Sequence, residues 1–195
     1  WVKQLKANDG VYANQIKVDR QGNVYTAGYF QGVVDFDPDI GVVNKTSVGY
    51  NDIFIQKLDL QGNLKWINNF GTSGNDYAYA IELDNNEDIY VTGAISGNSN
   101  EVVDFNPVGA SYNVQCCGPY LHKLDSLGNL IWLRQISTYG FSLAVDSFSN
   151  VYISGNSSLE KFSSVSWPIW TKMHSGSSST ADLTLDNNNN IFDPI

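Results

Sequence analysis

The chain has few of the residues that build metal clusters and disulfide frameworks. Its 195 residues include two cysteines and two histidines. The cysteines are the adjacent pair Cys116 and Cys117, which are too few to form a zinc cluster by themselves. We expect one of these side chains to face inward and the other outward, without a chemical role. The alternative is a redox role for a strained bond between neighbours, which is rare, or for an exposed thiol pair.

Positive charge, long apolar runs and helical periodicity are also scarce. Eleven Lys and Arg residues stand against 20 Asp and Glu residues, which gives a formal net charge of −9. Nucleic acids and anionic membranes attract basic patches, so we expect neither as a partner. No apolar run approaches the roughly 20 residues that span a bilayer, which predicts no membrane insertion. No stretch sustains apolar residues at helical spacing over three turns, so no helix is expected.

What the chain does contain is a repeated hairpin pattern. The stretch DIFIQKLDLQGNLKW, residues 52–66, is typical of a strand, a tight turn and a second strand that ends in Trp66. Asp59 opens the turn and can accept a backbone N–H, while Gly62 supplies a left-handed residue that forms a bulge. A large flat side chain at a fixed place in each copy predicts packing between successive units. In the second copy, YLHKLDSLGNLIW, the corresponding residues are Asp125, Gly128 and Trp132.

A different hairpin pattern precedes each of these copies. It combines a strand that ends in Asp, a polar turn, and a strand of the form hydrophobic-Tyr-x-x-Gly. A glycine at this place indicates a strand end or a close approach of two backbones. We interpret the aspartates, and Asp88 with them, as residues of hairpin turns and not of calcium loops. The pattern includes Asp19, Asp84, Asp146 and Asp186, with Gly28, Gly93 and Gly155 after the first three.

Together the two hairpins form a unit of four strands with a core of about 40 residues, which is typical of a propeller blade. We therefore predict an all-β fold of four-stranded antiparallel β-propeller blades, about three and a half of them in this chain. An open row of blades exposes strand edges, so we expect a segment of a longer propeller. The alternative is a four-bladed ring closed through the strand of Trp1. The predicted units are residues 1–10 (the end of a blade), 11–70, 71–136, 137–174 (with Trp167 or Trp170) and 175–195 (partial).

Three motifs in a fixed order extend this prediction from fold to family. They are VD-x-x-GN-V-Y-x-x-G-Y-F, V-D-F-D-P and D-I-F-I-x-KLD-x-x-GN-x-x-W, and they resemble the bacterial β-propeller repeat called SBBP over residues 1–170. The third unit lacks V-D-F-D-P. The resemblance implies a secreted or cell-surface protein, often from Bacteroidota that use type IX secretion, with the secretion machinery as a partner. It defines no catalytic residues. The Asp-Gly-Trp spacing is also similar to the docking motif of quinoprotein propellers, which supports blade geometry and not a quinone cofactor.

The V-D-F-D-P loop is the one candidate for a metal site. It places two side-chain oxygens two residues apart, and oxygen ligands of this kind suit calcium. Calcium needs six or more ligands, however, and the sequence indicates no further partners. We interpret these residues as turn residues, with Phe36 and Phe105 filling an apolar gap, and predict no cofactor; calcium is the alternative. The candidate ligands are Asp35 and Asp37, with Asp104 and Asn106 in the second copy.

The remaining polar residues give little support to an enzyme. His122 aligns with Gln56 and is interpreted as a tolerated surface or blade-face substitution. The Ser-rich run that begins at His174 lacks a G-x-S-x-G elbow and is interpreted as a loop. A glycosidase needs two carboxylates at a set separation in space, and most of the acidic residues lie in turns or in repeated positions. The acids considered are Glu82, Asp84, Glu87, Glu101 and Glu160.

We therefore predict a non-catalytic scaffold or binding module of a secreted or surface-anchored protein, with a role in adhesion or in binding a protein or carbohydrate. The 11 tyrosines, 17 glycines and single methionine agree with an extracellular all-β protein. The alternatives are a carbohydrate-active hydrolase or lyase with a central acidic pair, and an export substrate known through its secretion partner. Non-repeating carboxylates of raised pKa in a deep pocket would favour the enzyme. Tyrosines outside the repeat, candidates for ligand contact, are Tyr29, Tyr50, Tyr112 and Tyr139.

Overall fold

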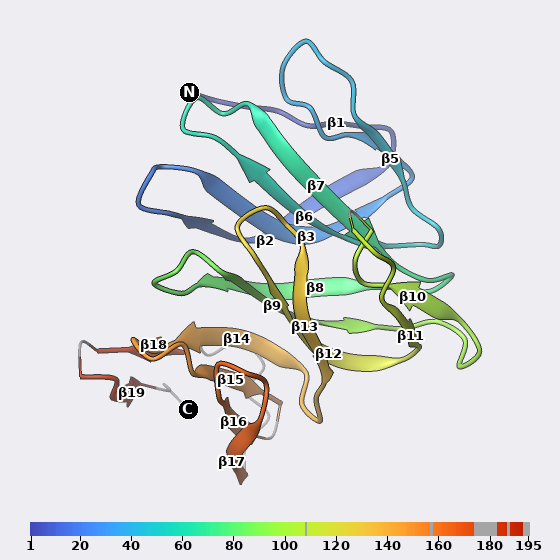
Figure 1. The fold of residues 1–195 in the computed structure, drawn as a ribbon. Helices are drawn as coiled ribbons and strands as arrows, with labels where there is room; N and C mark the ends of the chain where they lie inside the picture. The colour runs from blue at the N-terminus through green and yellow to red at the C-terminus, as the bar shows by residue number, and fades with distance from the viewer. Residues whose placement is uncertain (108, 157, 174–182, 187, 193–195) are drawn as a thin grey trace.

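The structure is a computed structural model that describes residues 1–107, 109–156, 158–173, 183–186 and 188–192. Every regular element in these ranges is a β-strand (Figure 1). The described residues accordingly offer no helix of the length and apolarity that crossing a membrane requires. The all-β prediction is confirmed. The Ser-rich run from His174 lies outside the described residues.

Three four-stranded antiparallel sheets follow one another along the chain, and a two-stranded sheet comes after them. Blade one consists of β2 (Gly10–Val18), β3 (Val24–Gln31), β6 (Asp52–Leu58) and β7 (Leu64–Phe70). Blade two consists of β8 (Tyr77–Leu83), β9 (Ile89–Ile95), β12 (Gly118–Leu124) and β13 (Leu130–Gln135). Blade three consists of β14 (Gly140–Val145), β15 (Val151–Gly155), β16 (Ser158–Phe162) and β17 (Pro168–Met173). The final sheet pairs β18 (Thr184–Leu185) with β19 (Ile191–Phe192).

The sheets form a partial β-propeller. Their first strands, β2, β8, β14 and β18, contact one another in succession, which places them on the inside of the arc. The N-terminus and the sheet of β18 and β19 lie at opposite ends of the row of sheets (Figure 1). Strand β1 (Lys6–Ala7) pairs with β4 (Val33–Asp35), and in the described residues it does not pair with β18 or β19. The alternative of a ring closed through the strand of Trp1 is therefore wrong for these residues.

The insertions between the second and third strands of blades one and two carry small sheets of their own. Strand β4 also pairs with β5 (Asn44–Thr46), and β10 (Val102–Asp104) pairs with β11 (Asn113–Gln115). The V-D-F-D-P residue Phe36 is fully buried between Phe30 and Phe54, at 5.2 and 5.1 Å between ring centroids. Phe105 packs in the same way against Phe70 and Tyr120. Both rings fill an apolar gap, as predicted.

An aspartate closes most of the tight turns by accepting several hydrogen bonds, and Ser163 takes its place in the outer turn of blade three. The Asp19 carboxylate accepts the backbone N–H groups of Gln21 and Asn23 and the hydroxyl of Tyr25. In the outer hairpins, the backbone N–H of Asn63 is the main cause that lowers the pKa of Asp59. These bonds hold the turn in the form that the sequence pattern predicts. The same arrangement recurs at Asp84, Asp125, Asp146 and Asp186.

A tyrosine, a lysine and a tryptophan stack across the strands of each blade. In blade one, the Lys57 ammonium lies 4.8 Å from the ring centroid of Tyr25, and Trp66 meets the same ring edge-on. A cation held over an aromatic ring contributes about 0.5–1 kcal/mol at exposed sites. The stack recurs as Tyr90, Lys123 and Trp132 in blade two and as Tyr152, Lys161 and Trp170 in blade three.

The same tryptophans also join one blade to the next. The indole N–H of Trp66 donates to the Ser126 carbonyl at 3.2 Å, in the outer turn of blade two. The indole of Trp132 donates to the Ser164 carbonyl at 3.1 Å, in the outer turn of blade three. Trp66 pairs with Lys57, Trp132 with Lys123 and Trp170 with Lys161, so the three tryptophans occupy matching register positions. The repeat position in blade three is Trp170, because Trp167 is 68% exposed and pairs with no lysine.

Trp1 extends the series of inter-blade contacts although its own segment forms no blade strand. Its indole N–H donates to the Leu60 carbonyl at 2.8 Å, in the outer turn of blade one. Leu60 follows Asp59 as Ser126 follows Asp125, so the two carbonyls occupy equivalent places in their turns. Trp1 therefore occupies the place that the tryptophan of a preceding blade would take.

The repeated glycine of the second strand lies against the backbone of the first strand. A Cβ at Gly93 would overlap the carbonyl oxygen of Tyr77 and would lie 2.6 Å from the hydroxyl of Tyr120. A bulge between Ala78 and Ala80 accompanies this contact. Only glycine leaves room for two backbones at this distance. Gly28 and Gly155 meet the carbonyl oxygens of Tyr12 and Tyr139 in the same way.

Candidate functional site

Residues that do not recur from blade to blade gather at one end of blade two. Asp76 lies eight residues before the turn aspartate Asp84, and the equivalent residues of blades one and three are Val11 and Thr138. Asp52 lies five residues before the stacked lysine of blade one, and its equivalent in blade two is Gly118. The blade fold requires residues that recur, so residues present in one blade alone are candidates for another role.

A cleft of 540 Å³ opens beside these residues, where blade two meets the start of blade three. Its volume is within the range of about 300–1,000 Å³ that is common for small-molecule sites. Its wall combines aromatic rings, an amide, a hydroxyl and a sulfur atom, and none of its residues is charged. The main side chains are Asn75, Tyr77, Tyr79, Ser96, Cys117 and Tyr139.

Aromatic rings extend from the cleft across all three blades, on the first strands β2, β8 and β14 and on the second strand β3 of blade one. We call Tyr12, Tyr29, Tyr77, Tyr79 and Phe141 the tyrosine row. Successive ring centroids in the row lie 4.9, 4.8, 6.0 and 5.0 Å apart. Burial raises the pKa of Tyr79 to about 12, and the neighbouring Tyr139 and Tyr77 add to the effect. The phenol of Tyr79 therefore keeps its proton and can donate a hydrogen bond.

The tyrosines predicted to contact a ligand divide into two groups. Tyr29 belongs to the tyrosine row, and Tyr139 lines the cleft. Tyr50 and Tyr112 lie in the insertions, are 65% and 46% exposed, and do not line the cleft. Tyr139 is also seven residues before Asp146, the offset that separates Tyr12 and Tyr77 from their own turn aspartates. The interpretation of Tyr139 as lying outside the repeat was wrong, because the third unit is shorter and hides the correspondence.

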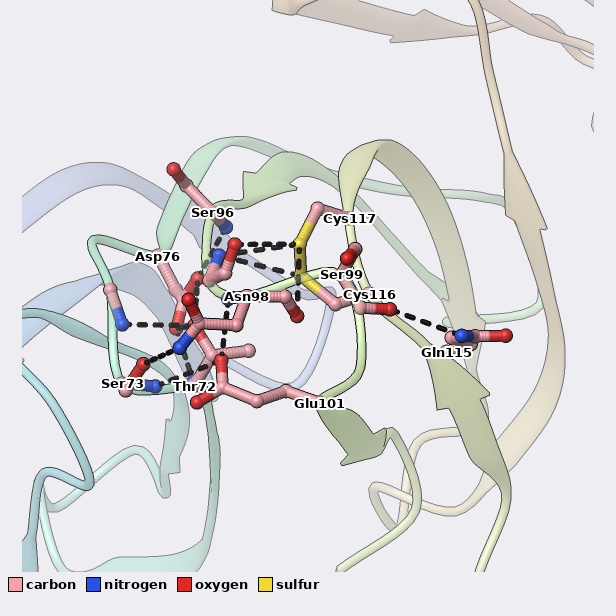
Figure 2. The surroundings of a disulfide bond; sticks show 12 residues. Thr72, Ser73, Asp76, Ser96, Asn98, Ser99, Glu101, Gln115, Cys116 and Cys117 are labelled. Atoms are coloured by element: carbon pink, nitrogen blue, oxygen red, sulfur yellow. Dashed lines mark hydrogen bonds between the residues drawn. A yellow bond between two sulfur atoms is a disulfide. The ribbon is translucent and has the colours of Figure 1, made fainter.

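The two cysteines form a disulfide bond with each other at the rim of the cleft (Figure 2). The half-buried Cys116 packs against the core of blade two, and the exposed Cys117 lines the cleft. The expected orientations, one side chain inward and one outward, are therefore present. The two residues also form the bond between neighbours that was the alternative expectation. The backbone N–H of Gly97 lies 3.4 and 3.3 Å from the two sulfur atoms. The disulfide thus holds the end of the insertion against the residues that follow β9.

Two buried carboxylates lie beneath the same loops. Asp76 accepts hydrogen bonds from the Thr72 hydroxyl and from the Ser96 backbone N–H, the latter at 2.7 Å (Figure 2). Asp52 accepts the backbone N–H of Val48 at 3.1 Å. Burial raises the pKa of Asp52 to about 6, and the charge of Asp76 adds to the rise. Burial raises the pKa of Asp76 as well, against the hydrogen bonds that lower it.

Asp52 and Asp76 have the raised pKa that the enzyme alternative requires, but they do not line a pocket as it also requires. Asp52 and Asp76 do not recur, and both have a raised pKa. Both side chains are fully buried, neither lines the cleft, and their oxygens accept bonds from the surrounding loops. Carboxylates so placed hold the loops together and are not presented to a substrate.

Three of the acids considered in the sequence, Glu82, Asp84 and Glu87, lie near one another at the turn end of blade two, and the other two lie elsewhere. Glu82 forms an ion pair with Lys17 at 2.6 Å between nitrogen and oxygen, near the turn end of blade two. Glu160 accepts the hydroxyl of Ser137 at 2.6 Å in blade three. Glu101 lies by the disulfide, where the Ser73 hydroxyl and then the Asn98 backbone N–H lower its pKa. Asp84 and Glu87 belong to the turn after β8.

The V-D-F-D-P side chains serve the turn geometry that we predicted. One oxygen of Asp35 accepts the backbone N–H groups of Asp37 and Val43, and Asp104 does the same for Asn106 and Tyr112. The Asp37 side chain accepts the N–H of Asp39 in turn. Across the residues that the structure describes, no three His, Cys, Asp or Glu side chains gather as a metal site would require.

His122 is not a surface residue. It is fully buried among the rings of Phe70, Phe105 and Tyr120, with centroids 5.6, 5.6 and 6.4 Å away. Burial lowers the pKa of its imidazole to about 3, and the Phe105 carbonyl opposes the shift weakly. The alignment of His122 with Gln56 identified equivalent positions in two blades. Gln56 is also buried, and its side-chain amide donates a hydrogen bond to the Phe36 carbonyl. The blade-face alternative is correct, and the ring stays neutral there.

Residues 127–158 match the family model of the SBBP beta-propeller repeat. The match runs from the outer turn of blade two to the first residue of β16 in blade three, and it supports the repeat family. The chain is also similar to an uncharacterized WD repeat-containing protein of Acanthamoeba polyphaga mimivirus, with 22% identity over 180 residues. The match covers 79% of this chain and 13% of that protein, so the chain spans a small part of the relative's length. Both comparisons support a propeller that acts as a binding or scaffold module.

The raised pKa of Asp52 predicts a pH dependence of stability. The ordinary pKa is 3.8 and the folded value is about 6, so the folded state binds this proton more tightly than the unfolded chain. Its contribution to stability is therefore full below the ordinary value and is lost as the pH rises through 6. Because asparagine does not ionise, we expect the Asp52→Asn variant to keep its stability as the pH rises through 6. Relative to the natural protein, the variant should gain up to about 3 kcal/mol between about pH 4 and pH 7, measured by urea unfolding.

Asp59→Asn is the matched control for this experiment. Backbone and side-chain bonds lower the pKa of Asp59, so its contribution is present above the ordinary pKa and is lost as the pH falls. As the pH rises, the stability of Asp52→Asn should therefore increase relative to the natural protein, and the stability of Asp59→Asn should decrease relative to it. An Asp52→Asn variant that follows the natural protein at every pH would contradict the raised pKa.

Proposed function

We propose that this chain is a non-catalytic binding module of a larger extracellular β-propeller protein, and that the 540 Å³ cleft is its ligand-binding site. The observation that carries the proposal is the gathering of non-recurring residues around that cleft. Asp52, Asp76 and the disulfide fix the loops, and Tyr79 takes the place of Asn14 in blade one. The equivalent positions of the other blades carry other residues.

A location outside the cell, as a secreted or surface-anchored protein, forms part of the proposal. Disulfides persist in oxidising compartments and are rare in the cytosol. The bond between Cys116 and Cys117 includes an exposed sulfur, which a reducing compartment would leave open to attack. The resemblance to bacterial secreted repeats supports the same location, and a role in adhesion and export by type IX secretion follow as finer proposals.

The open face of blade one supports the proposal of further blades. Ile16 lies three residues before its turn aspartate, as Ile81 does in blade two. Ile16 is 59% exposed, whereas Ile81 is fully buried where blade one covers it. A cleft of 380 Å³ lined by Trp1, Val11 and Ile16 follows this open face. A blade of the same kind would bury these side chains, as blade one buries those of blade two.

Backbone NMR with a panel of soluble probes tests the binding site. The panel contains neutral hexasaccharides, an oligogalacturonate and a lysine-rich peptide. We expect at least one probe to shift the amide signals of Tyr79, Ser96 and Gly97, and Tyr139→Ala to weaken that binding by about tenfold. Tyr50→Ala, which alters an exposed tyrosine away from the cleft, is the control and should bind normally.

Two results of this experiment would contradict the proposal. Shifts confined to residues away from the cleft would place the binding site elsewhere. Release of reducing sugar from a probe, lost in Asp76→Asn, would favour the carbohydrate-active enzyme instead.

A further inference from the structure

We propose that the cleft binds a neutral oligosaccharide, an inference that rests on the cleft being the ligand-binding site. The first observation is the missing charge. Charged residues make up 16% of the sequence, yet none lines the cleft. A charged ligand would lose its hydration without meeting an opposite charge, which costs several kcal/mol for an unpaired ion. The lining therefore selects against ions of either sign.

Anionic ligands face a further obstacle in the surrounding charge. The carboxylates of Asp76 and Glu101 lie among the loops beside the cleft, bonded to the backbone N–H groups of Ser96 and Asn98 (Figure 2). The chain as a whole carries a formal charge of −9. Both the local and the overall field thus repel an acidic sugar or a phosphate.

Cationic ligands lack an accessible partner. Asp76 is fully buried and accepts bonds from Thr72 and Ser96. Glu101 accepts the Asn98 backbone N–H at 2.9 Å and the Ser73 backbone N–H at 3.4 Å. Neither carboxylate lines the cleft, so a cation bound there would not contact a counter-charge.

A sugar ring suits both kinds of surface that the cleft presents. The C–H groups on the face of a pyranose are apolar and can pack on an aromatic ring, while its hydroxyls need hydrogen-bond partners. Tyr77, Tyr79 and Tyr139 supply rings and phenolic donors in the cleft. The Asn75 side-chain oxygen accepts a bond from Asn51 at 2.7 Å, which directs that amide and leaves its N–H₂ group for a ligand.

The tyrosine row favours a chain of sugars over a single ring. From Tyr79 in the cleft the row continues through Tyr77 and Tyr29 to Tyr12, which is 54% exposed. A single sugar in the cleft would leave this outer part of the row unused. We therefore expect affinity to rise with the number of sugar units, and Tyr12→Ala to affect long chains alone.

Isothermal titration calorimetry with sugars of graded length tests the inference. The neutral probes are the disaccharides and hexasaccharides of β-glucan, α-glucan, xylan, mannan and chitin. At least one hexasaccharide should bind with a Kd below about 1 mM and more tightly than its disaccharide. Tyr79→Ala should weaken binding by about tenfold, while Tyr79→Phe, which keeps the ring, should weaken it less. Tyr12→Ala should lower the affinity for the hexasaccharide and leave that for the disaccharide unchanged.

The exposed Tyr139, at 44% exposure, gives a second variant that should fold normally if Tyr79→Ala does not. Circular dichroism of each variant checks the fold. Binding of the oligogalacturonate or the lysine peptide at the cleft, without binding of any neutral sugar, would overturn the ligand class and leave the binding site standing. The absence of binding by every probe would overturn both proposals.

Discussion

Replacement of Trp66 by alanine is expected to lower the free energy of unfolding by about 3 kcal/mol, the lower end of the cost for removing a packed tryptophan. The indole packs on the ring of Tyr25 and lies 3.1 Å from the position that a Cβ on Gly128 would take. It also donates to the Ser126 carbonyl of the next blade. The substitution removes contacts within blade one and between blades one and two at once. Urea unfolding followed by circular dichroism measures the effect.

Trp167→Ala is the matched control for this prediction. Trp167 is 68% exposed and lies before the strand position that Trp170 occupies, so its removal should change stability by less than about 0.5 kcal/mol. Trp66→Phe should be intermediate, because it keeps a ring but loses the hydrogen bond, worth about 1 kcal/mol. Equal effects of Trp66→Ala and Trp167→Ala would show that the inter-blade contact does not stabilise the fold.

Replacement of Gly93 by alanine is expected to cost about 2–3 kcal/mol, the range for forcing an extra methyl group into a packed site. The new Cβ would overlap the carbonyl oxygen of Tyr77, and the hydroxyl of Tyr120 would lie 2.6 Å away. Neither strand can move aside without breaking the pairing of β8 with β9 at the bulge. Thermal unfolding should show a clear fall in the midpoint temperature.

Gly10→Ala provides the comparison. A Cβ at Gly10 would lie 2.7 Å from a ring carbon of Tyr12, which is 54% exposed and free to rotate away. Its cost should therefore stay below about 1 kcal/mol, although the same atoms are added. A Gly93→Ala variant as stable as Gly10→Ala would mean that the second strand can shift, and that glycine is not required by the close approach.

The turn residues and the tryptophans show what local chemistry can predict. Asp59 and Gly62 define a tight turn through bonds to residues two and four positions away, so the sequence pattern contains the whole cause. The position of Trp66 on its strand follows from the same local count. The all-β fold of four-stranded units could be predicted for this reason. The sequence patterns contain the tyrosine and the lysine that stack with the tryptophan, but the stacking itself was not predicted, although their constant offsets in all three blades were a usable signal.

The candidate site could not be predicted in the same way. Asn75, Cys117 and Tyr139 are separated by more than a strand each in the sequence, and they meet because blades two and three pack side by side. The burial of His122 likewise depends on Phe70 and Phe105, which come from two other segments. The residues next to these positions do not indicate which distant segment will pack over them.

The sequence by itself determined the strand–turn–strand units, their four-stranded repeat and the place of one tryptophan in each, because hydrogen bonds and periodicity act over a few residues. The tertiary structure alone decided three things: that the two cysteines are bonded at a cleft, that Asp52 and Asp76 are buried together, and that the tyrosines of blades one and two form a row with Phe141 of blade three. The last two depend on how far one blade rotates onto the next. That rotation is set by the packing of whole sheets, which no local pattern records.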